Sequence, residues 1–232
     1  MSTADNRQLK IDSDPADCLA LTHQARKAQA TRDRIIAAVI ELINEQGLAG
    51  ATSGQIARRA GITWGAVQHH FGTKDDILTA VLHRAHAAYL ARLDSAQLTQ
   101  GDLVGRVNRF VDTVWEHYRS DLYFAFSEIL RASRLNSSGD YIAPFSLAEQ
   151  QNIHTAIMAK MFDEFEIPSV RLNDAFRFIH RFLAGFSLDR IMEPDAPFEQ
   201  RHLQRIKDEL LSLPDNHGVK GRLSFTTKGN LG

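Results

Sequence analysis

The sequence lacks several features that would assign the protein to particular classes. Cys18 is the one cysteine among 232 residues, which excludes an internal disulfide framework and a four-cysteine zinc site and fits a reducing compartment. No run of about 18 consecutive apolar residues occurs, so no membrane-spanning segment is expected. The N-terminus, MSTADNRQLKIDSDPADC, has no apolar run after a basic start and so does not resemble a signal peptide. We therefore expect a cytoplasmic location.

The sequence also lacks an excess of either charge. Its formal net charge is −1, which by itself predicts neither a nucleic acid nor an acidic substrate as partner. The charges are unevenly distributed, however, because residues 26–74 contain seven Lys/Arg against three Asp/Glu, a net charge of +4. The rest of the chain is acidic overall, so any nucleic-acid partner is expected at this basic segment.

Helical spacing of apolar residues begins at Thr31. Thr31 is a plausible N-cap for a first helix whose apolar face ends at Gly47. Two short helices follow over 52–60 and 63–71, each opened by a threonine and separated by Gly61. This is the layout of a helix-turn-helix.

Helical patterns also fill the rest of the chain. Thr73 is expected to cap a fourth helix with a stripe of apolar residues. Further helices are predicted over 103–118, 122–130, about 144–165 with Pro144 in its first turn, 172–192 and 198–211. No alternating pattern requires a sheet, so the predicted fold class is all-α.

Four segments follow from these patterns. Residues 1–24 are polar and are predicted to be a flexible N-terminal tail. We predict a three-helix helix-turn-helix domain over 25–74, joined to a larger helical ligand-sensing and dimerisation domain over 75–213. Residues 214–232 are predicted to be a C-terminal tail.

The segment from Thr52 to Phe71 carries the clearest functional pattern. DNA-binding helix-turn-helix motifs need one helix across the phosphate backbone and a second whose first residues reach base edges. Gly65 costs helix propensity near the start of the second helix, and close approach of its backbone to a phosphodiester would offset that cost. A helical hairpin that binds nothing is the alternative, but it leaves the local basic charge unexplained.

Many spaced positions in this region resemble one family. They are Thr31-Arg-Asp-Arg-Ile-Ile-Ala-Ala, Glu45-Gln-Gly, Thr52, Ile56-Ala57, Ala60-Gly-Ile-Thr63, Gly65, Val67, His70-Phe71, Lys74 and Ile77-Leu78. Together they resemble the N-terminal sequence of the TetR/AcrR family of bacterial repressors, over about a fifth of the chain. The resemblance implies a three-helix DNA-binding domain, a helical C-terminal regulatory domain and a homodimer that binds double-stranded operator DNA.

Two positions depart from the family pattern. The family often has a tyrosine at the position of Gln68 and a small or charged residue at that of Trp64. Gln68 can pair with adenine in the major groove, which indicates altered base readout. Trp64 could pack on sugars or a thymine methyl, or alternatively on the protein's own surface.

Roles in DNA binding follow as hypotheses. Phosphate contacts are expected from Thr52, Ser53, Thr63 and Lys74, and His70 is expected either to fill the turn or to touch phosphate. Base edges or the groove wall are assigned to Trp64, Ala66, Gln68 and His69, beside Gly65. His69 and His70 point about 100° apart, so no shared metal is expected. Arg26 and Lys27 could form a phosphate-seeking arm or, equally, a solvated face.

The larger domain is predicted to bind a small hydrophobic or amphipathic effector, including one with a carboxylate. The lining residues are predicted to be Phe110, Tyr118, Phe126, Arg131, Arg134, His154, Met158, Met161 and Phe178, with His180 as a further polar anchor. No cofactor or metal is expected.

A homodimer interface is predicted on the last two helices because the helix over 172–192 is apolar on two faces. Its residues are predicted to be Phe176, Ile179, Phe182, Leu183, Phe186, Leu203, Ile206 and Leu210. Two reading helices about 34–36 Å apart would then bind a pseudo-palindrome. Effector binding would lower operator affinity if the effector prefers one state of the protein.

Two other functional classes fit the sequence less well. An enzyme would use His117, His154 or His180, but no nucleophile elbow, metal motif, P-loop or dinucleotide fingerprint accompanies them. An architectural DNA-binding protein would be a small, uniformly basic chain, unlike this one with its acidic, aromatic-rich larger domain. The sequence therefore favours a ligand-responsive repressor.

Overall fold

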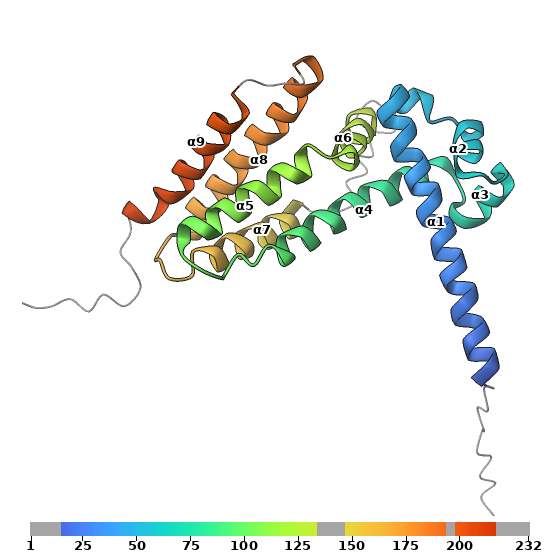
Figure 1. Ribbon diagram of the computed structural model, residues 1–232, viewed down its shortest axis with the longest axis horizontal. Helices are drawn as coiled ribbons and strands as arrows, with labels where there is room; N and C mark the ends of the chain where they lie inside the picture. The colour runs from blue at the N-terminus through green and yellow to red at the C-terminus, as the bar shows by residue number, and fades with distance from the viewer. Residues whose placement is uncertain (1–14, 134–146, 194–197, 217–232) are drawn as a thin grey trace, which may run out of the picture. The chain divides into compact units, whose positions relative to one another are not determined.

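The computed structural model describes residues 15–133, 147–193 and 198–216, and within these residues it forms helices and no β-strand (Figure 1). The all-α prediction is confirmed. None of the described helices combines the length and the apolar composition needed to cross a membrane. The helices are α1 (Pro15–Gly50), α2 (Ser53–Ala60), α3 (Trp64–Phe71), α4 (Lys74–Ser95), α5 (Leu103–Tyr118), α6 (Asp121–Ser133), α7 (Leu147–Met161), α8 (Ser169–Met192) and α9 (Glu199–Leu211), followed by a 3-10 turn (Leu213–Asn216).

The chain divides into two compact units, Met1–Leu78 and Thr79–Gly232. The division falls within α4, four residues after the boundary that the sequence predicted at residue 74. In the first unit α1 contacts both α2 and α3. The apolar stripe predicted for the first helix is buried there together with residues of α2, α3 and α4: Ile35, Ile36, Val39, Leu42, Ile43, Ile56, Val67 and Ile77.

The first helix begins sixteen residues earlier than predicted. Thr31 is not its N-cap, because the Thr31 hydroxyl donates to the Lys27 carbonyl one turn back, at 3.0 Å, inside α1. The segment before Thr31 is rich in alanine, glutamine, arginine and lysine, which are good helix formers, and Pro15 suits a first helical turn. Residues 15–24 of the predicted flexible tail are therefore helical, whereas residues 1–14 lie outside the described residues. The helix was predicted to end at Gly47, and Gly47 does have a non-helical φ of 70°, but α1 continues beyond it to Gly50.

The second unit is built around α5, which contacts α6, α7, α8 and α9. Its predicted bounds match the structure, with Asp102 as N-cap accepting from the Gly105 amide at 2.9 Å. The bounds predicted for α9 agree to one residue and those for α8 to three at its start. Pro144, Arg134 and most of the predicted C-terminal tail lie outside the described residues.

Candidate functional site

The turn between α2 and α3 is fixed by local hydrogen bonds. Thr52 caps α2 by accepting from the Gln55 amide at 3.3 Å. Gly61 ends α2 with a left-handed φ of 66°, and the amides of Gly61 and Ile62 donate to the carbonyls of Arg58 and Ala57. This is the Schellman arrangement, which favours glycine at its left-handed position. The helix-turn-helix predicted from the two threonines and Gly61 is confirmed.

The beginning of α3 presents donors to its surroundings. The Thr63 hydroxyl oxygen accepts from the Ala66 amide at 3.2 Å, as predicted for an N-cap. An oxygen that accepts in this way keeps its own proton for donation, and Thr63 is exposed. The cap therefore leaves a hydroxyl donor beside the positive end of the helix dipole, an arrangement that suits an anionic oxygen.

The residues predicted to read bases differ in how far α3 exposes them. Gly65, Gln68 and His69 are exposed, whereas Trp64, Ala66 and His70 are partly buried. Trp64 and Gln68 are one helical turn apart, and so are Gly65 and His69, which places each pair on one face. Val67, at the opposite side, is fully buried and attaches the helix to the core.

A capping box fixes the beginning of α4. The backbone amide and the hydroxyl of Thr73 both donate to the Asp76 carboxylate, at 2.8 and 2.6 Å, and the Asp76 amide donates back to the Thr73 hydroxyl at 3.1 Å. The hydrogen bonds from the Thr73 side chain and then its backbone lower the pKa of Asp76. Lys74 is the first residue of α4 and is partly buried, while Thr52 is exposed and Ser53 partly buried at the start of α2.

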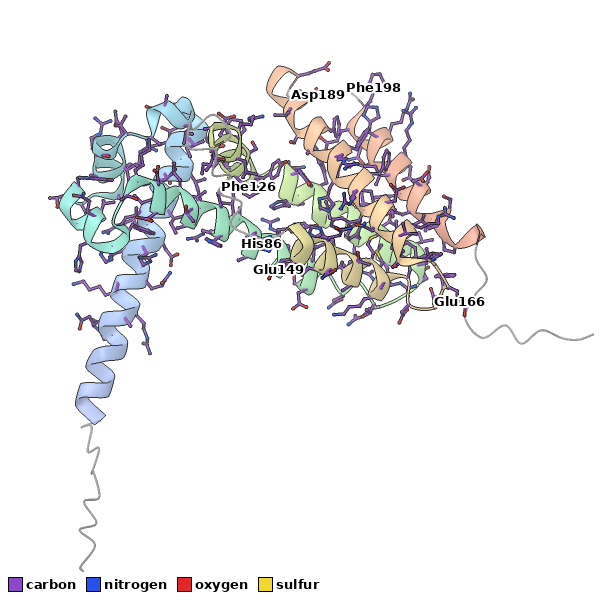
Figure 2. The ribbon with its side chains drawn as sticks, turned by 180° about the vertical axis from the view of Figure 1, so that it is seen from behind. His86, Phe126, Glu149, Glu166, Asp189 and Phe198 are labelled. Carbon is purple, nitrogen blue, oxygen red and sulfur yellow. The ribbon has the colours of Figure 1, made fainter. Side chains whose placement is uncertain are left out.

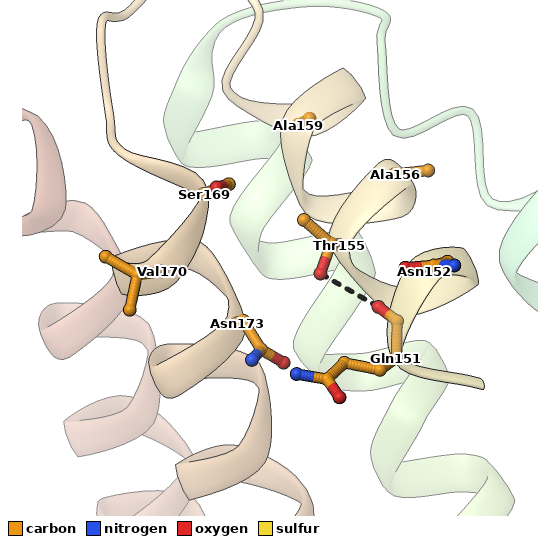
Figure 3. Close-up of a pocket in the computed structure, with 8 residues that line it drawn as sticks. All are labelled: Gln151, Asn152, Thr155, Ala156, Ala159, Ser169, Val170 and Asn173. Carbon is orange, nitrogen blue, oxygen red and sulfur yellow. Dashed lines mark hydrogen bonds between the residues drawn. The ribbon is translucent and has the colours of Figure 1, made fainter. Parts of the chain in front are cut away.

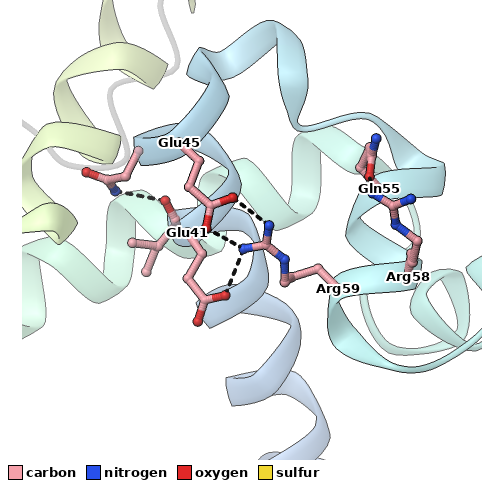
Figure 4. A network of polar contacts seen from close by, with 7 residues as sticks. Glu41, Glu45, Gln55, Arg58 and Arg59 are labelled. Atoms are coloured by element: carbon pink, nitrogen blue, oxygen red, sulfur yellow. Dashed lines mark hydrogen bonds and ion pairs between the residues drawn. The ribbon is translucent and has the colours of Figure 1, made fainter.

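Arg59 is engaged within the protein. Its guanidinium binds Glu45 at 2.6 Å and Glu41 at 3.1 Å, whereas Arg58 contacts Gln55 on its own helix (Figure 4). The bond from Arg59 lowers the pKa of Glu45, and the carboxylates raise the pKa of Arg59. Part of the basic charge counted in the sequence is thus neutralised between α1 and α2.

Sequence reasoning missed a role for Arg32. Its guanidinium donates to the carbonyl of His70 and lies over the ring of Phe71, 4.0 Å from the centroid. A cation at the last turn of α3 complements the helix dipole. Arg32 thereby attaches the end of α3 to α1. The signal was its place among the family-like residues Thr31-Arg-Asp-Arg, but helical spacing alone could not indicate its partner.

The residues predicted to line a ligand pocket do not form one lining. Phe110, Met158 and Met161 are fully buried in the apolar core, and Phe178 is 49% exposed on α8. Arg131 is half exposed and pairs with Glu128 on its own helix. Arg134 lies outside the described residues. Tyr118 and His154 remain, and they belong to a different group of side chains, beside which Phe126 stacks on Tyr123.

That group, here called the polar cluster, consists of Tyr89, His117, Tyr118, Tyr123, His154 and His180. The Tyr118 hydroxyl lies 2.6 Å from Nδ1 of His180, and the Tyr89 hydroxyl lies 2.9 Å from Nε2 of the same ring. The rings of His117 and Tyr89 are 4.7 Å apart, and those of Tyr118 and Tyr123 are 4.4 Å apart. Five helices, α4 to α8, contribute to it.

Burial keeps the polar cluster uncharged. Desolvation lowers the pKa of His117 and His154 to about 4 and that of His180 well below its usual value. It also raises the pKa of Tyr123 to about 12 and those of Tyr89 and Tyr118 well above their usual value. Imidazoles and phenols are therefore neutral at pH 7.

Acidification is expected to destabilise the protein through these histidines. Their pKa values are lower in the folded than in the unfolded chain, so the unfolded chain binds more protons between about pH 4 and 6.5. Stability that is fully present above pH 6.5 is lost as the pH falls, by roughly 2 kcal/mol at pH 5 for each of His117 and His154. Urea unfolding between pH 5 and 8 measures the effect, and a His154→Gln variant should show a shallower slope. An unfolding free energy that rises on acidification would contradict this account.

An open groove of about 540 Å³ lies elsewhere in the second unit, between α7 and α8 (Figure 3). Neutral groups such as Gln151, Asn152, Thr155 and Asn173 line it, and the Thr155 hydroxyl donates to the Gln151 carbonyl at 2.8 Å. None of the residues predicted to bind ligand contributes to this groove.

Most residues predicted for a dimer interface are used inside the chain. Seven of them are buried in its own core, namely Phe176, Ile179, Leu183, Phe186, Leu203, Ile206 and Leu210, and Phe182 is partly buried. The exposed side of α8 instead carries Phe178, Arg181, Gly185 and Leu188. Phe198, 52% exposed at the start of α9, lies at the same end of these helices as Asp189 (Figure 2).

Comparison with known proteins finds similarity for a segment that lies mostly in the first unit. Residues 35–81 match the family described as "Bacterial regulatory proteins, tetR family". The HTH-type transcriptional regulator SrpR of Pseudomonas putida is 52% identical over 58 residues, which are 25% of this chain and 27% of SrpR. The chain thus matches about a quarter of that relative's length. These names are those of regulators and not of enzymes.

Solved structures support the fold over most of the chain. A transcriptional regulator from Rhodococcus sp. Rha1 has a TM-score of 0.62 at 22% identity, covering 81% of this chain and 98% of the other. The multidrug binding protein EbrR, complexed with imidazole, has a TM-score of 0.52 at 19% identity, covering 77% of this chain and 93% of the other. At these identities the likeness concerns the fold alone.

Proposed function

We propose that this chain, whose N-terminal unit carries the DNA-binding domain of the tetR family, is a homodimeric repressor of transcription. Each subunit inserts α3 into the major groove of a pseudo-palindromic operator. A small molecule bound in the second unit favours a state with lower operator affinity. The observation that carries the proposal is the exposed face of α3, fixed at both ends by Thr63 and Arg32, in a segment that matches the family.

Phosphates are held by groups at three helix starts. Thr52 and Ser53 at α2, Thr63 at α3 and Lys74 at α4 supply hydroxyls, backbone amides and one cation. Gln68, Trp64 and His69 contact base edges or the groove wall, with Ala66 beside them. Because Arg59 is paired with Glu41 and Glu45, the phosphate contacts fall to these other groups.

The dimer forms through the exposed side of α8. Phe178 and Leu188 lie on this side, and a Cβ added at Gly185 would meet nothing within 4 Å. The chain's own packing therefore gives no reason for a glycine in mid-helix, where it costs about 1 kcal/mol relative to alanine. Close approach of the same helix from a second subunit supplies one, because a two-fold axis would bring the two α8 helices together.

The effector enters the second unit, as the name of the multidrug binding protein EbrR suggests for a protein of the same fold. The neutral rings of the polar cluster favour a small hydrophobic or amphipathic molecule over a charged one. A carboxylate-bearing effector would lack the anchor expected from Arg131, which is paired with Glu128.

Selection from a random DNA pool tests the proposal. Purified protein is expected to enrich a pseudo-palindrome, with two chains bound per site and an affinity that falls steeply with salt. Recovery of single half-sites bound by one chain would contradict binding as a dimer. Equal binding to all sequences would contradict the repressor.

Gly65→Ala offers a variant in which stability and DNA affinity are expected to change in opposite directions. A Cβ at Gly65 would meet only the Thr63 hydroxyl, at 4.0 Å. Alanine should therefore leave stability unchanged or raise it by up to about 1 kcal/mol. Operator affinity should fall about tenfold or more, because the added methyl group points to where the phosphodiester approaches. Thermal unfolding and DNA titration measure the two effects.

Gly61→Ala is the matched control for this glycine. Gly61 has a left-handed φ of 66° at the turn, so alanine there should destabilise the fold by about 1–2 kcal/mol. If Gly65→Ala instead behaved like Gly61→Ala, with lost stability and retained DNA affinity, the glycine would serve the fold and not the DNA.

A further inference from the structure

The polar cluster places six rings with hydrogen-bonding groups beside the apolar core that surrounds α5. Phe176 of that core stacks on His154 at 4.1 Å and on His180 at 3.9 Å. Buried polar groups cost stability unless they are hydrogen-bonded. Nε2 of His154 is buried and has no hydrogen-bond partner among the described residues. The cluster thus has a hydrogen-bonding capacity that the fold itself does not use.

The two bonds to His180 leave a second unused group. A neutral imidazole has one N–H and one bare nitrogen. The 2.6 Å contact suits an O–H donor from Tyr118 to Nδ1, and the 2.9 Å contact suits an N–H donor from Nε2 to the Tyr89 oxygen. We assign the bonds in this way, which leaves the Tyr89 hydroxyl proton without an acceptor among the bonds of the cluster.

The polar cluster reaches the surface of the second unit. His180 is strongly desolvated by its surroundings, but it is only partly buried, as are His154, Tyr123 and Phe126. These partly buried residues form the side from which a small molecule would reach the cluster. Among the described residues, Arg92 acts on His117 and Arg131 acts on Tyr123 from exposed positions, and Arg131 is paired with Glu128, while the partly buried His86 acts on His117 and His154.

We propose that the polar cluster is a binding site for an uncharged aromatic compound that carries a hydrogen-bond acceptor such as a ketone. This rests on the ligand-responsive function proposed above and names the chemical class of the effector. The Tyr89 hydroxyl donates to the acceptor, and the rings of His154, Tyr123 and Phe126 contact the aromatic part. A carboxylate bound at the buried Tyr89 hydroxyl would lose its hydration, whereas Arg92 and Arg131 act on the cluster from exposed positions, so the site discriminates against anions.

Three ligands of nearly the same shape test the proposal on the full-length protein. 2-Acetylnaphthalene has the acceptor, 2-naphthoate is its anionic counterpart, and 2-ethylnaphthalene has neither acceptor nor charge. Calorimetric titration is expected to show the ketone binding about tenfold or more tightly than the carboxylate. Tyr89→Phe should weaken the ketone about five- to tenfold, the effect of one hydrogen bond, and leave the hydrocarbon unchanged.

Ser212→Ala is the control, because it removes a hydroxyl at an exposed position after α9 that bonds the Glu209 carbonyl and lies outside the polar cluster, so binding of all three ligands should be unchanged. Tighter binding of 2-naphthoate, equal losses for ketone and hydrocarbon in Tyr89→Phe, or no binding of any of the three would overturn the site. Operator titration with and without the ketone separates the two proposals. Ketone binding that leaves DNA affinity unchanged supports the site and contradicts the ligand-responsive function.

Discussion

Phe178→Asp is expected to separate the dimer into monomers and to abolish tight operator binding. Phe178 is 49% exposed on the outer side of α8, and a two-fold interface would bury it once per subunit. Burial of a phenylalanine side chain contributes roughly 1.5–3 kcal/mol, and symmetry doubles the loss. Two carboxylates would also face each other, so the dimer dissociation constant should rise about a thousandfold or more.

Analytical ultracentrifugation and operator titration measure this effect. Operator affinity should fall about 100-fold, because each monomer then reaches only one half-site. Val104→Asp is the matched control, since Val104 is 50% exposed on α5 and should tolerate the same change. A Phe178→Asp protein that remains dimeric would show that α8 does not form the interface, and circular dichroism would establish that it is folded.

Gln68→Ala is expected to cause the second large loss of operator affinity. It should reduce discrimination between base pairs more than it reduces general affinity for DNA. A bidentate pair between glutamine and adenine contributes about 1–3 kcal/mol of discrimination against a wrong base. A dimer carries two copies, so operator binding should fall by about 30-fold at least. Binding to unrelated DNA should change little, because phosphate contacts dominate it.

Titration of the selected operator and of variants with each base pair exchanged measures the effect of Gln68→Ala. Gln204→Ala, at an exposed position of α9, should leave all affinities unchanged. If the variant discriminates among the operators as the wild type does, Gln68 does not contact a base. Trp64, one helical turn away, then becomes the candidate for base contact.

Local signals in the sequence were enough to predict the helix-turn-helix and most helix bounds. Thr52, Thr63 and Asp102 cap the helices that follow them, and Gly61 makes the predicted turn. Such features depend on neighbours along the chain and are therefore visible in a sequence. The early start of α1 was missed because Thr31 can cap a helix but can equally bond one turn back within it.

Tertiary partners could not be predicted in the same way. Helix α8 is apolar on two faces, and the sequence alone does not indicate which face the rest of the chain covers. The structure buries Ile179 and Leu183, which were expected at an interface, in the chain's own core and exposes Phe178, which was expected in a pocket. Likewise, the bonds of His180 to Tyr89 and Tyr118 join residues 91 and 62 positions apart, so no spacing pattern could indicate them.

The most direct test of the central claim is the number of chains bound to the DNA sequence that the protein selects. The account predicts an enriched pseudo-palindrome whose half-site centres lie about one helical turn apart, or a multiple of it, and which binds two chains. The affinity of the protein for this site should fall steeply between 50 and 200 mM salt, by about a thousandfold for six phosphate contacts. Enrichment of no sequence, or one chain bound to an isolated half-site with full affinity, would contradict it.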